Sequence, residues 1–245
     1  MTQHSNRLKT LEPIQVTPQN RAELSARSYA LASQIFLNLA AASWEKLLAN
    51  PRAYKTRIYF IQQGGLDCGI AVFSYFQLDQ PKRARVLRAA VGMLPSARGE
   101  NTINPIIARE NLTFFLSTPF SKKYFSSVFL GPVMYHLATK VLYDAYPSCH
   151  TDGKQARSVI DACIALFGFP RAGDHPAVVS TGLAVRFQEG EAEAIRTSAS
   201  PTLQFYTGIN PDFDKGNGVV LVSPHTVANV FFSTVNLLRK QKVYK

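Results

Sequence analysis

Apolar residues recur at helical spacing at Leu24, Leu31, Ile35 and Leu39, which predicts a helix in the first third of the chain. A second, short helix is predicted over Trp44–Ala49, because Ser43 can cap its first turn and Asn50-Pro51 ends it. The pattern then changes. The next apolar segments are rich in Ile, Val, Tyr and Phe, as strands are.

Two of these segments, 56–62 and 68–78, flank Gly64-Gly65, which predicts an antiparallel hairpin. A third strand is predicted over Arg85–Leu94 and ends at Pro95. The chain then returns to a helix, since Asn104 can cap it and Pro105 suits its first turn.

The rest of the chain continues to alternate between helix and strand. The pattern predicts a strand over Tyr124–Leu130, a helix opened by Gly131-Pro132, a helix over Val159–Phe167 ended by Gly168, strands over Val178–Phe187, Thr202–Thr207 and Gly218–Val222, and a last helix from Ser223-Pro224. Residues 188–200 are expected to form a loop or a short surface helix. This order predicts an α/β (α+β) fold with a mixed, largely antiparallel twisted sheet flanked by helices.

Composition places the chain among ordinary globular proteins, with 46% hydrophobic and 18% charged residues. No apolar run is long enough to span a bilayer, and residues 1–10 lack the apolar core of a signal peptide, so a cytoplasmic protein is expected. The three cysteines, Cys68, Cys149 and Cys163, are expected to be reduced thiols.

The net charge of +11 favours partners that carry phosphates, acidic protein surfaces or anionic lipid headgroups. Several cations gather around the third predicted strand: Lys82, Arg83, Arg85, Arg88 and Arg98. No compact spacing of His and Cys is present, so no structural metal is expected.

The turn Pro95–Asn101 joins that strand to the next helix, and it is the leading candidate site. A helix N-terminus leaves backbone N–H groups unpaired and favours negative charge, so phosphate binds well there. Arg98 adds a planar cationic fork, and Gly99 permits close approach of the backbone. The turn is therefore suited to a pyrophosphate.

The order hairpin, strand, Pro-x-x-Arg-Gly turn, helix, strand and helix resembles the GNAT acyltransferase superfamily, in which the fourth strand leads into the loop that grips an acyl carrier's pyrophosphate. The resemblance implies a single GNAT-like domain over 1–245, with a core at about 24–146 and a C-terminal extension at about 151–245. The extension is similar to that of the larger branch with acyl-homoserine-lactone and N-acyl amino acid synthases. One departure is Glu100-Asn101, where the family usually has a second small residue, so Glu100 is expected to point away from phosphate.

The resemblance implies transfer of an acyl group from acyl-CoA or an acyl carrier protein to an amine of a small molecule. In the implied site, backbone N–H groups near Val91, Gly92 and Met93 polarise the carbonyl, while Arg98, Gly99 and Asn101 hold the carrier. Tyr135 matches the family's general acid, and His136 beside it is a candidate base. A tyrosine packed in the core or on the helix surface, and a packed or exposed histidine, are the alternatives for these two residues.

Two other functions remain open from the residues alone. Gln62 and Asp67-Cys68-Gly69 resemble the nucleophile segment of papain-like cysteine peptidases, with His175 as the base. Against this, the residues after Cys68 have the content of a strand, whereas such a nucleophile opens a helix. The charge, with aromatics beside Arg57 such as Tyr59 and Phe60, is also compatible with a basic nucleic-acid-binding module, although no recognised motif supports it.

Overall fold

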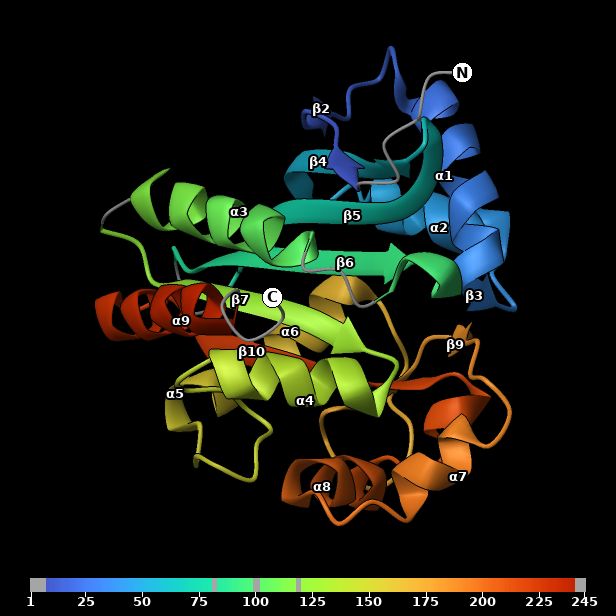
Figure 1. Ribbon diagram of the computed structural model, residues 1–245. Coiled ribbons are helices and arrows are strands. Elements are labelled where there is room, and N and C mark those ends of the chain that lie inside the picture. Colours follow the sequence, from blue (N-terminus) through green and yellow to red (C-terminus); the bar gives the residue numbers. More distant parts are fainter. Residues whose placement is uncertain (1–7, 81–82, 99–101, 118–119, 241–245) are drawn as a thin grey trace.

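The structure is a computed structural model that describes residues 8–80, 83–98, 102–117 and 120–240. Among these residues, eight strands form one sheet in the order β1-β4-β5-β6-β7-β10-β8, with β2 also paired to β4 (Figure 1). Neighbouring strands are antiparallel except β6 and β7, which run parallel. The strands are β1 (Lys9–Thr10), β2 (Ile14–Gln15), β4 (Ala53–Gln63), β5 (Leu66–Gln77), β6 (Arg85–Met93), β7 (Lys123–Phe129), β8 (Val178–Ser180) and β10 (Asn217–Pro224).

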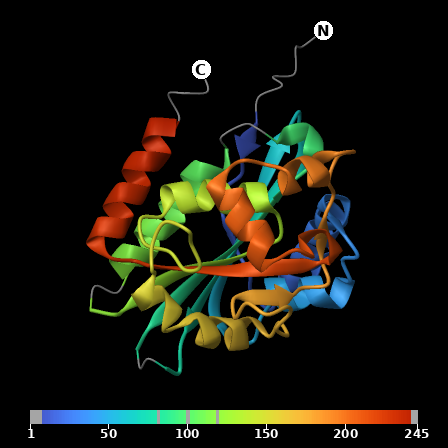
Figure 2. The ribbon, with the colours of Figure 1, turned by 90° about the horizontal axis from the view of Figure 1, so that it is seen from below.

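Helices cover both faces of the sheet. Helices α3, α4 and α9 lie on one face, and α1, α2 and α6 lie on the other, as the two views of Figures 1 and 2 show. A small second sheet joins β3 (Phe36–Leu37) to β9 (Ala184–Val185). The helices are α1 (Arg21–Ile35), α2 (Ala41–Leu48), α3 (Ile103–Ser117), α4 (Pro132–Val141), α5 (Lys154–Arg157), α6 (Ile160–Phe167), α7 (Glu191–Arg196), α8 (Pro201–Ile209) and α9 (Val227–Lys240), with short 3-10 turns at Pro95–Ala97 and Phe213–Lys215.

The predicted hairpin forms as the sequence indicated. Gly64 and Gly65 have φ angles of 59° and 86°, in the left-handed region where glycine is favoured, so the chain reverses tightly between β4 and β5. Side chains on the central strands alternate between the two faces. On β6, Leu87 and Ala89 pack with α3, whereas Val86 joins the core on the α6 side.

The expected fold class is confirmed: the sheet is mixed, mostly antiparallel and flanked by helices. The chain also follows the predicted order of hairpin, β6, turn, α3, β7 and α4. The late strand β10 lies between β7 and β8, so a segment near residue 220 completes the sheet beside a strand near residue 125.

Three sequence predictions are wrong. Residues 202–207 are not a strand but lie in α8, because Pro201 suits the first helical position and the buried Thr202 and Tyr206 lie one turn apart. Residues 178–187 are not one strand but contain only β8 and β9.

The last helix does not begin at Ser223-Pro224. Both residues still pair with β7, and the helix begins at Val227. The hydroxyl of Thr226 accepts a hydrogen bond from the backbone N–H of Asn229 at 3.2 Å, so Thr226 caps the first turn.

Candidate functional site

The parallel pairing between β6 and β7 ends before either strand does. It runs from Arg85 opposite Lys123 to Ala89 opposite Ser127. Beyond this point β6 continues for four residues, still fully paired with β5, while β7 continues for two residues paired with β10. The two strands therefore separate at their C-terminal ends.

Three of the predicted site residues lie on this separated part of β6. Val91 is half-buried, while Gly92 and Met93 are buried. Residues 90–93 have no strand partner on the β7 side in the described structure. The edge of β6 that faces β7 is therefore the edge from which backbone groups can polarise a carbonyl held between the strands.

Close packing explains the glycine at position 92. A Cβ atom there would lie 3.0 Å from Cγ2 of Ile35 and 3.1 Å from Cζ of Phe36, at the junction of α1 and β3. A larger residue would require these side chains to shift by a few tenths of an ångström, so glycine suits the tight packing of this junction against β6. Ile35 and Phe36 thus close the α1 side of the point where the strands separate.

The turn after β6 leads directly into α3. Pro95–Ala97 form one 3-10 turn, and Arg98 follows in an extended conformation with its side chain exposed. The Nε of Arg98 donates to the carbonyl oxygen of Met93 at 3.4 Å, which leaves the outer guanidinium nitrogens available to an anion. The predicted ligands Gly99 and Asn101, and Glu100 between them, lie outside the described residues.

Helix α3 begins at Ile103, with Asn104 and Pro105 in its first turn. Its buried side packs on the sheet through Ile106, Glu110 and Phe114. The helix thus begins five residues after the exposed Arg98, and its N-terminal end carries a partial positive charge.

Tyr135, the predicted general acid, is fully buried on α4. Its hydroxyl donates to the carbonyl oxygen of Pro147 at 2.7 Å, and its ring lies 5.0 Å from that of Tyr206. Burial raises the pKa of its hydroxyl above the ordinary value. The geometry is that of a packed tyrosine, so an acid role requires this hydrogen bond to open. His136, the candidate base, follows it and is half-buried.

A buried polar cluster on the α3 side was not found from the sequence. The carboxylate of Glu110 is fully buried, accepts hydrogen bonds from the hydroxyls of Tyr59 and Tyr75, and pairs with Arg57 at 3.0 Å. Burial raises the pKa of both tyrosines, and the carboxylate they bind raises it further. A signal was present, because Glu110 stands four residues from both Ile106 and Phe114 and so falls on the buried stripe of α3.

Arg88 lies on the opposite face of the sheet and is only 5% exposed. Its guanidinium lies 4.4 Å from the ring of Phe167 and 5.4 Å from that of Phe169, and no described ion pair includes it. Burial lowers its pKa to about 10. The basic cluster predicted around this strand is thus not one surface, because Arg88 points into the core while Arg98 is exposed.

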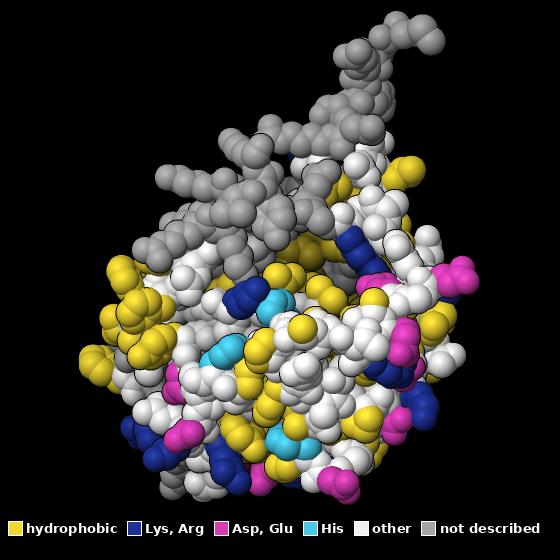
Figure 3. Space-filling model, turned by 60° about the horizontal axis from the view of Figure 1, so that its bottom comes forward, with side chains coloured by type: hydrophobic (Ala, Val, Ile, Leu, Met, Phe, Trp, Pro, Cys, Tyr) yellow, Lys and Arg dark blue, Asp and Glu magenta, His cyan; other side chains and the backbone are white. Residues whose placement is uncertain are grey.

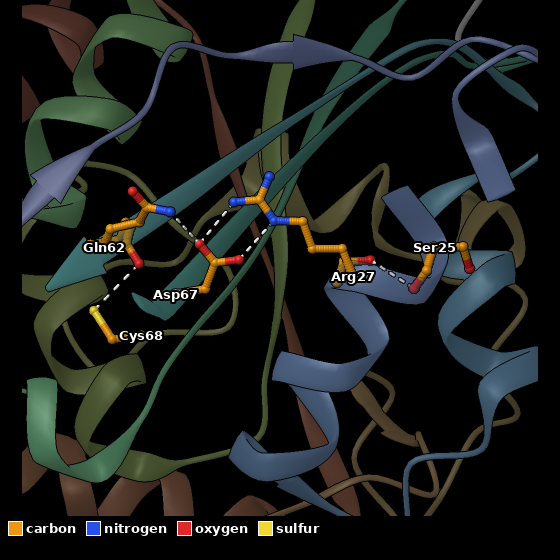
Figure 4. Close-up of polar contacts among 7 residues, drawn as sticks. Ser25, Arg27, Gln62, Asp67 and Cys68 are labelled. Atoms are coloured by element: carbon orange, nitrogen blue, oxygen red, sulfur yellow. Dashed lines mark hydrogen bonds and ion pairs between the residues drawn. The ribbon is translucent and has the colours of Figure 1, made fainter. Parts of the chain in front are cut away.

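The peptidase alternative is wrong. Cys68 lies within β5, is 5% exposed, and its thiol donates to the carbonyl oxygen of Ile61 at 3.3 Å. The Gln62 amide donates instead to Asp67, whose carboxylate is held by both Nε and an outer nitrogen of Arg27 from α1 (Figure 4).

The proposed base of that peptidase site is also too far away. His175 lies just before β8 and packs near Tyr146, with ring centroids 6.2 Å apart. Strands β6, β7 and β10 lie between β5 and β8, which corresponds to roughly 19 Å at the usual strand spacing. A nucleophile and its base must be within hydrogen-bond reach.

The residues considered above for nucleic-acid binding are buried or ion-paired. Tyr59 and Phe60 are each 1% exposed, so neither ring is available to stack on a base, and Arg57 pairs with Glu110. Over the described residues, no group of three or more His, Cys, Asp or Glu side chains gathers as a metal site would require. None of the helices in the described part of the chain is long and apolar enough to cross a membrane.

The hairpin, β6, the turn, α3, β7 and α4 follow one another in the order on which the sequence resemblance to the GNAT superfamily rests, and β10 lies between β7 and β8 in the sheet. No protein-family model matches the chain, and no curated protein matches it.

Solved structures similar to the chain are N-acetyltransferases and a probable N-acyltransferase. A GNAT family acetyltransferase from Brucella melitensis in complex with acetyl-CoA is 19% identical over 55% of this chain and 82% of its own, with a TM-score of 0.34. A probable N-acyltransferase from Enterococcus faecalis is 16% identical over 54% of this chain and 32% of its own, with a TM-score of 0.36. A chimeric spermidine N-acetyltransferase from Vibrio cholerae is 10% identical over 88% of this chain and 97% of its own, with a TM-score of 0.36. At these TM-scores the matches do not assign the chain to a family.

Proposed function

We propose that this chain is an acyltransferase that moves an acyl group from a thioester carrier, acyl-CoA or acyl carrier protein, to the amine of a small molecule. The observation that carries the proposal is the early end of the β6–β7 pairing at Ala89 and Ser127. It leaves the backbone edge of residues 90–93 open, directly before the turn into α3.

The carrier's phosphates are proposed to bind at this turn. Arg98 is exposed there, and its outer guanidinium nitrogens can donate two parallel hydrogen bonds to phosphate oxygens. The N-terminus of α3 adds the favourable end of a helix dipole. Gly99 and Asn101 are proposed as further ligands, since they stand between Arg98 and the helix in the sequence.

The thioester is proposed to lie between the separated strands. Backbone N–H groups near Val91, Gly92 and Met93 would stabilise the oxyanion when the amine attacks the carbonyl carbon. The new C–N bond forms as the C–S bond breaks, the amine loses a proton, and the departing thiolate gains one. Positioning therefore supplies most of the rate enhancement, and the protein forms no covalent bond.

Tyr135 and His136 are proposed as the residues that handle the two protons. Tyr135 would protonate the thiolate after exchanging its hydrogen bond to Pro147, and half-buried His136 would accept the amine's proton. Turnover by Tyr135→Phe and His136→Ala tests both roles. If Tyr135→Phe keeps full turnover and changes only the free energy of unfolding, its hydroxyl has a packing role alone.

Carrier binding gives the direct test. Acyl-CoAs of several chain lengths and acylated carrier proteins are titrated by calorimetry into the wild type, Arg98→Ala and the control Arg52→Ala, whose exposed guanidinium pairs with Asp79. Loss of charge-assisted hydrogen bonds predicts at least roughly tenfold weaker binding for Arg98→Ala. The control is expected to bind like the wild type. The proposal fails if no thioester carrier binds, or if Arg98→Ala binds as tightly as the wild type.

A further inference from the structure

The C-terminal helix α9 is attached to the rest of the protein by its polar side. Asn229 is 3% exposed; its side-chain oxygen accepts the N–H of Asp144 at 2.9 Å, and its amide donates to the carbonyl oxygen of Pro224 at 2.6 Å. About two turns later, the amide of Asn236 donates to the carbonyl oxygen of Lys140 at 3.4 Å. These contacts orient the helix.

The opposite side of α9 is apolar and faces outward. Val227 and Phe231, one turn apart, are 73% and 62% exposed. Phe232 is also exposed and stacks on the exposed ring of Tyr143, with centroids 4.9 Å apart. An amphipathic helix on a globular protein normally buries its apolar stripe, so this orientation is inverted.

The neighbouring helices extend this apolar surface, because α9 contacts both α3 and α4. Helix α3 exposes Leu112 and Leu116, the latter to 65%, and α4 exposes Met134 and Leu137. Figure 3 shows apolar side chains gathered at the left of the molecule, where α9 lies in Figure 1. The outer helical face is defined as Leu112, Leu116, Met134, Leu137, Val227 and Phe231.

The charged residues described as exposed on α3 and α4 are all basic. Lys140 on α4 and Lys122, just before β7, are exposed, and so is Arg109 on α3, which pairs with the exposed Glu12 at 3.6 Å. The one acidic residue in the sequences of the three helices is Glu110, which is buried and paired with Arg57. The outer helical face is therefore apolar with cations beside it.

We propose that the outer helical face is a docking surface for a membrane surface rich in anionic lipid headgroups. Exposed aromatic and aliphatic side chains enter the headgroup region, while nearby cations attract anionic lipids. A second copy of the chain fits less well, because it would bring the same cations together. The helices rest on the membrane surface in this arrangement and do not cross it.

The test uses the whole chain and vesicles of phosphatidylcholine, alone or mixed with phosphatidylglycerol. Co-sedimentation is expected with the mixed vesicles, to be much weaker with phosphatidylcholine alone, and to fall with added salt. Replacing both Val227 and Phe231 with serine is expected to reduce the partition coefficient at least roughly tenfold, because two apolar side chains lose their burial in the membrane. Lys140→Ala is expected to weaken binding to mixed vesicles only.

Leu66→Ser is the matched control, since Leu66 is 77% exposed in the β4–β5 hairpin and lies outside the outer helical face. It is expected to bind vesicles like the wild type, and so is Arg98→Ala, which separates this test from that of the proposed function. Circular dichroism checks that each variant is folded. The proposal is overturned if the wild type does not bind mixed vesicles, or if the Val227/Phe231 variant binds them unchanged. Light scattering that shows a wild-type dimer and a monomeric variant, without vesicle binding, would identify the surface as a dimer interface instead.

Discussion

The hydroxyl of Ser127 donates a 2.8 Å hydrogen bond to the carbonyl oxygen of Ala89, at the last residue pair that joins β6 to β7. Both residues are buried. A side chain thus holds the two strands together at the point where their backbone pairing stops. The position of the proposed thioester site depends on this contact.

Removal of this contact is predicted to affect both stability and carrier binding. Ser127→Ala is expected to lower the free energy of unfolding by about 1–2 kcal/mol, because a buried carbonyl loses its donor, and to weaken carrier binding. Urea unfolding and calorimetry measure the two effects. Ser223→Ala is the control, because Ser223 on β10 makes a similar 2.7 Å bond to the carbonyl oxygen of Asp144. An equal effect of both substitutions on carrier binding would contradict the prediction.

Glu110 is predicted to be important for stability. Glu110→Gln replaces a buried carboxylate that two tyrosine hydroxyls and Arg57 bind, so the cation loses its partner. We expect a loss of about 3 kcal/mol in guanidinium chloride unfolding. Glu45→Gln breaks an ion pair with Arg21 whose side chains are both about half exposed, and the expected loss is below about 1 kcal/mol. Equal losses for the two variants would show that the buried cluster contributes no more than a surface pair.

His225 is predicted to make stability depend on acid pH. Its ring lies between those of Phe114 and Phe125, and burial, followed by the charge of nearby Lys123, lowers its pKa to about 3. The unfolded chain takes up the proton near its ordinary pKa of about 6.5, whereas the folded chain stays neutral until about pH 3. Stability is therefore full above pH 6.5 or so and falls on acidification, by up to about 1.4 kcal/mol per pH unit.

Unfolding of the wild type and His225→Phe is to be compared across this pH range. In His225→Phe, the free energy of unfolding is expected to fall less steeply with decreasing pH than in the wild type. His175 has a lowered pKa as well, through burial and then the charge of Arg157, so His175→Gln is measured in parallel. If the free energy of unfolding depends on pH equally in His225→Phe and the wild type, the imidazole of His225 takes up its proton in the folded protein as readily as in the unfolded chain.

Arg88 is predicted to be replaceable by an apolar residue. Its guanidinium is buried against Phe167 and Phe169 and takes part in no described ion pair, so its desolvation is poorly compensated. Arg88→Met, which keeps most of the volume, is expected to leave the free energy of unfolding unchanged or to raise it by about 1–3 kcal/mol. Arg88→Ala is expected to destabilise by about 2–5 kcal/mol because it leaves a cavity. A large loss in Arg88→Met would show that the charge itself is needed.

Local signals in the sequence were sufficient for much of the central fold. Gly64-Gly65 located the hairpin, and Gly131-Pro132 and Gly168 located a helix start and a helix end. These features depend on conformational limits of single residues, so the sequence alone reveals them. Residues 202–207 contain the Thr, Phe and Tyr residues that strands favour, but Ser200-Pro201 before them is a helix start, and the segment lies in α8.

The site was less accessible to prediction because it depends on contacts between distant segments. The turn with Arg98 could be found from local sequence, but the separation of β6 from β7 depends on pairing between residues about 38 positions apart. Nothing near Tyr135 indicates that its hydroxyl meets Pro147. The close contact of Gly92 with Ile35 and Phe36 likewise arises only once α1 packs on the sheet.

The insertion of β10 between β7 and β8 has a consequence for synthesis of the protein on the ribosome. Residues 219–222 are fully buried, and they provide the hydrogen-bonding partner for the outer edge of β7. That edge stays open in a nascent chain until residue 224 has emerged, when nearly all of the preceding sequence is already outside the exit tunnel. The sheet is therefore expected to form fully only once residues 217–224 have left the exit tunnel, and shorter nascent chains are natural clients for chaperones that shield strand edges.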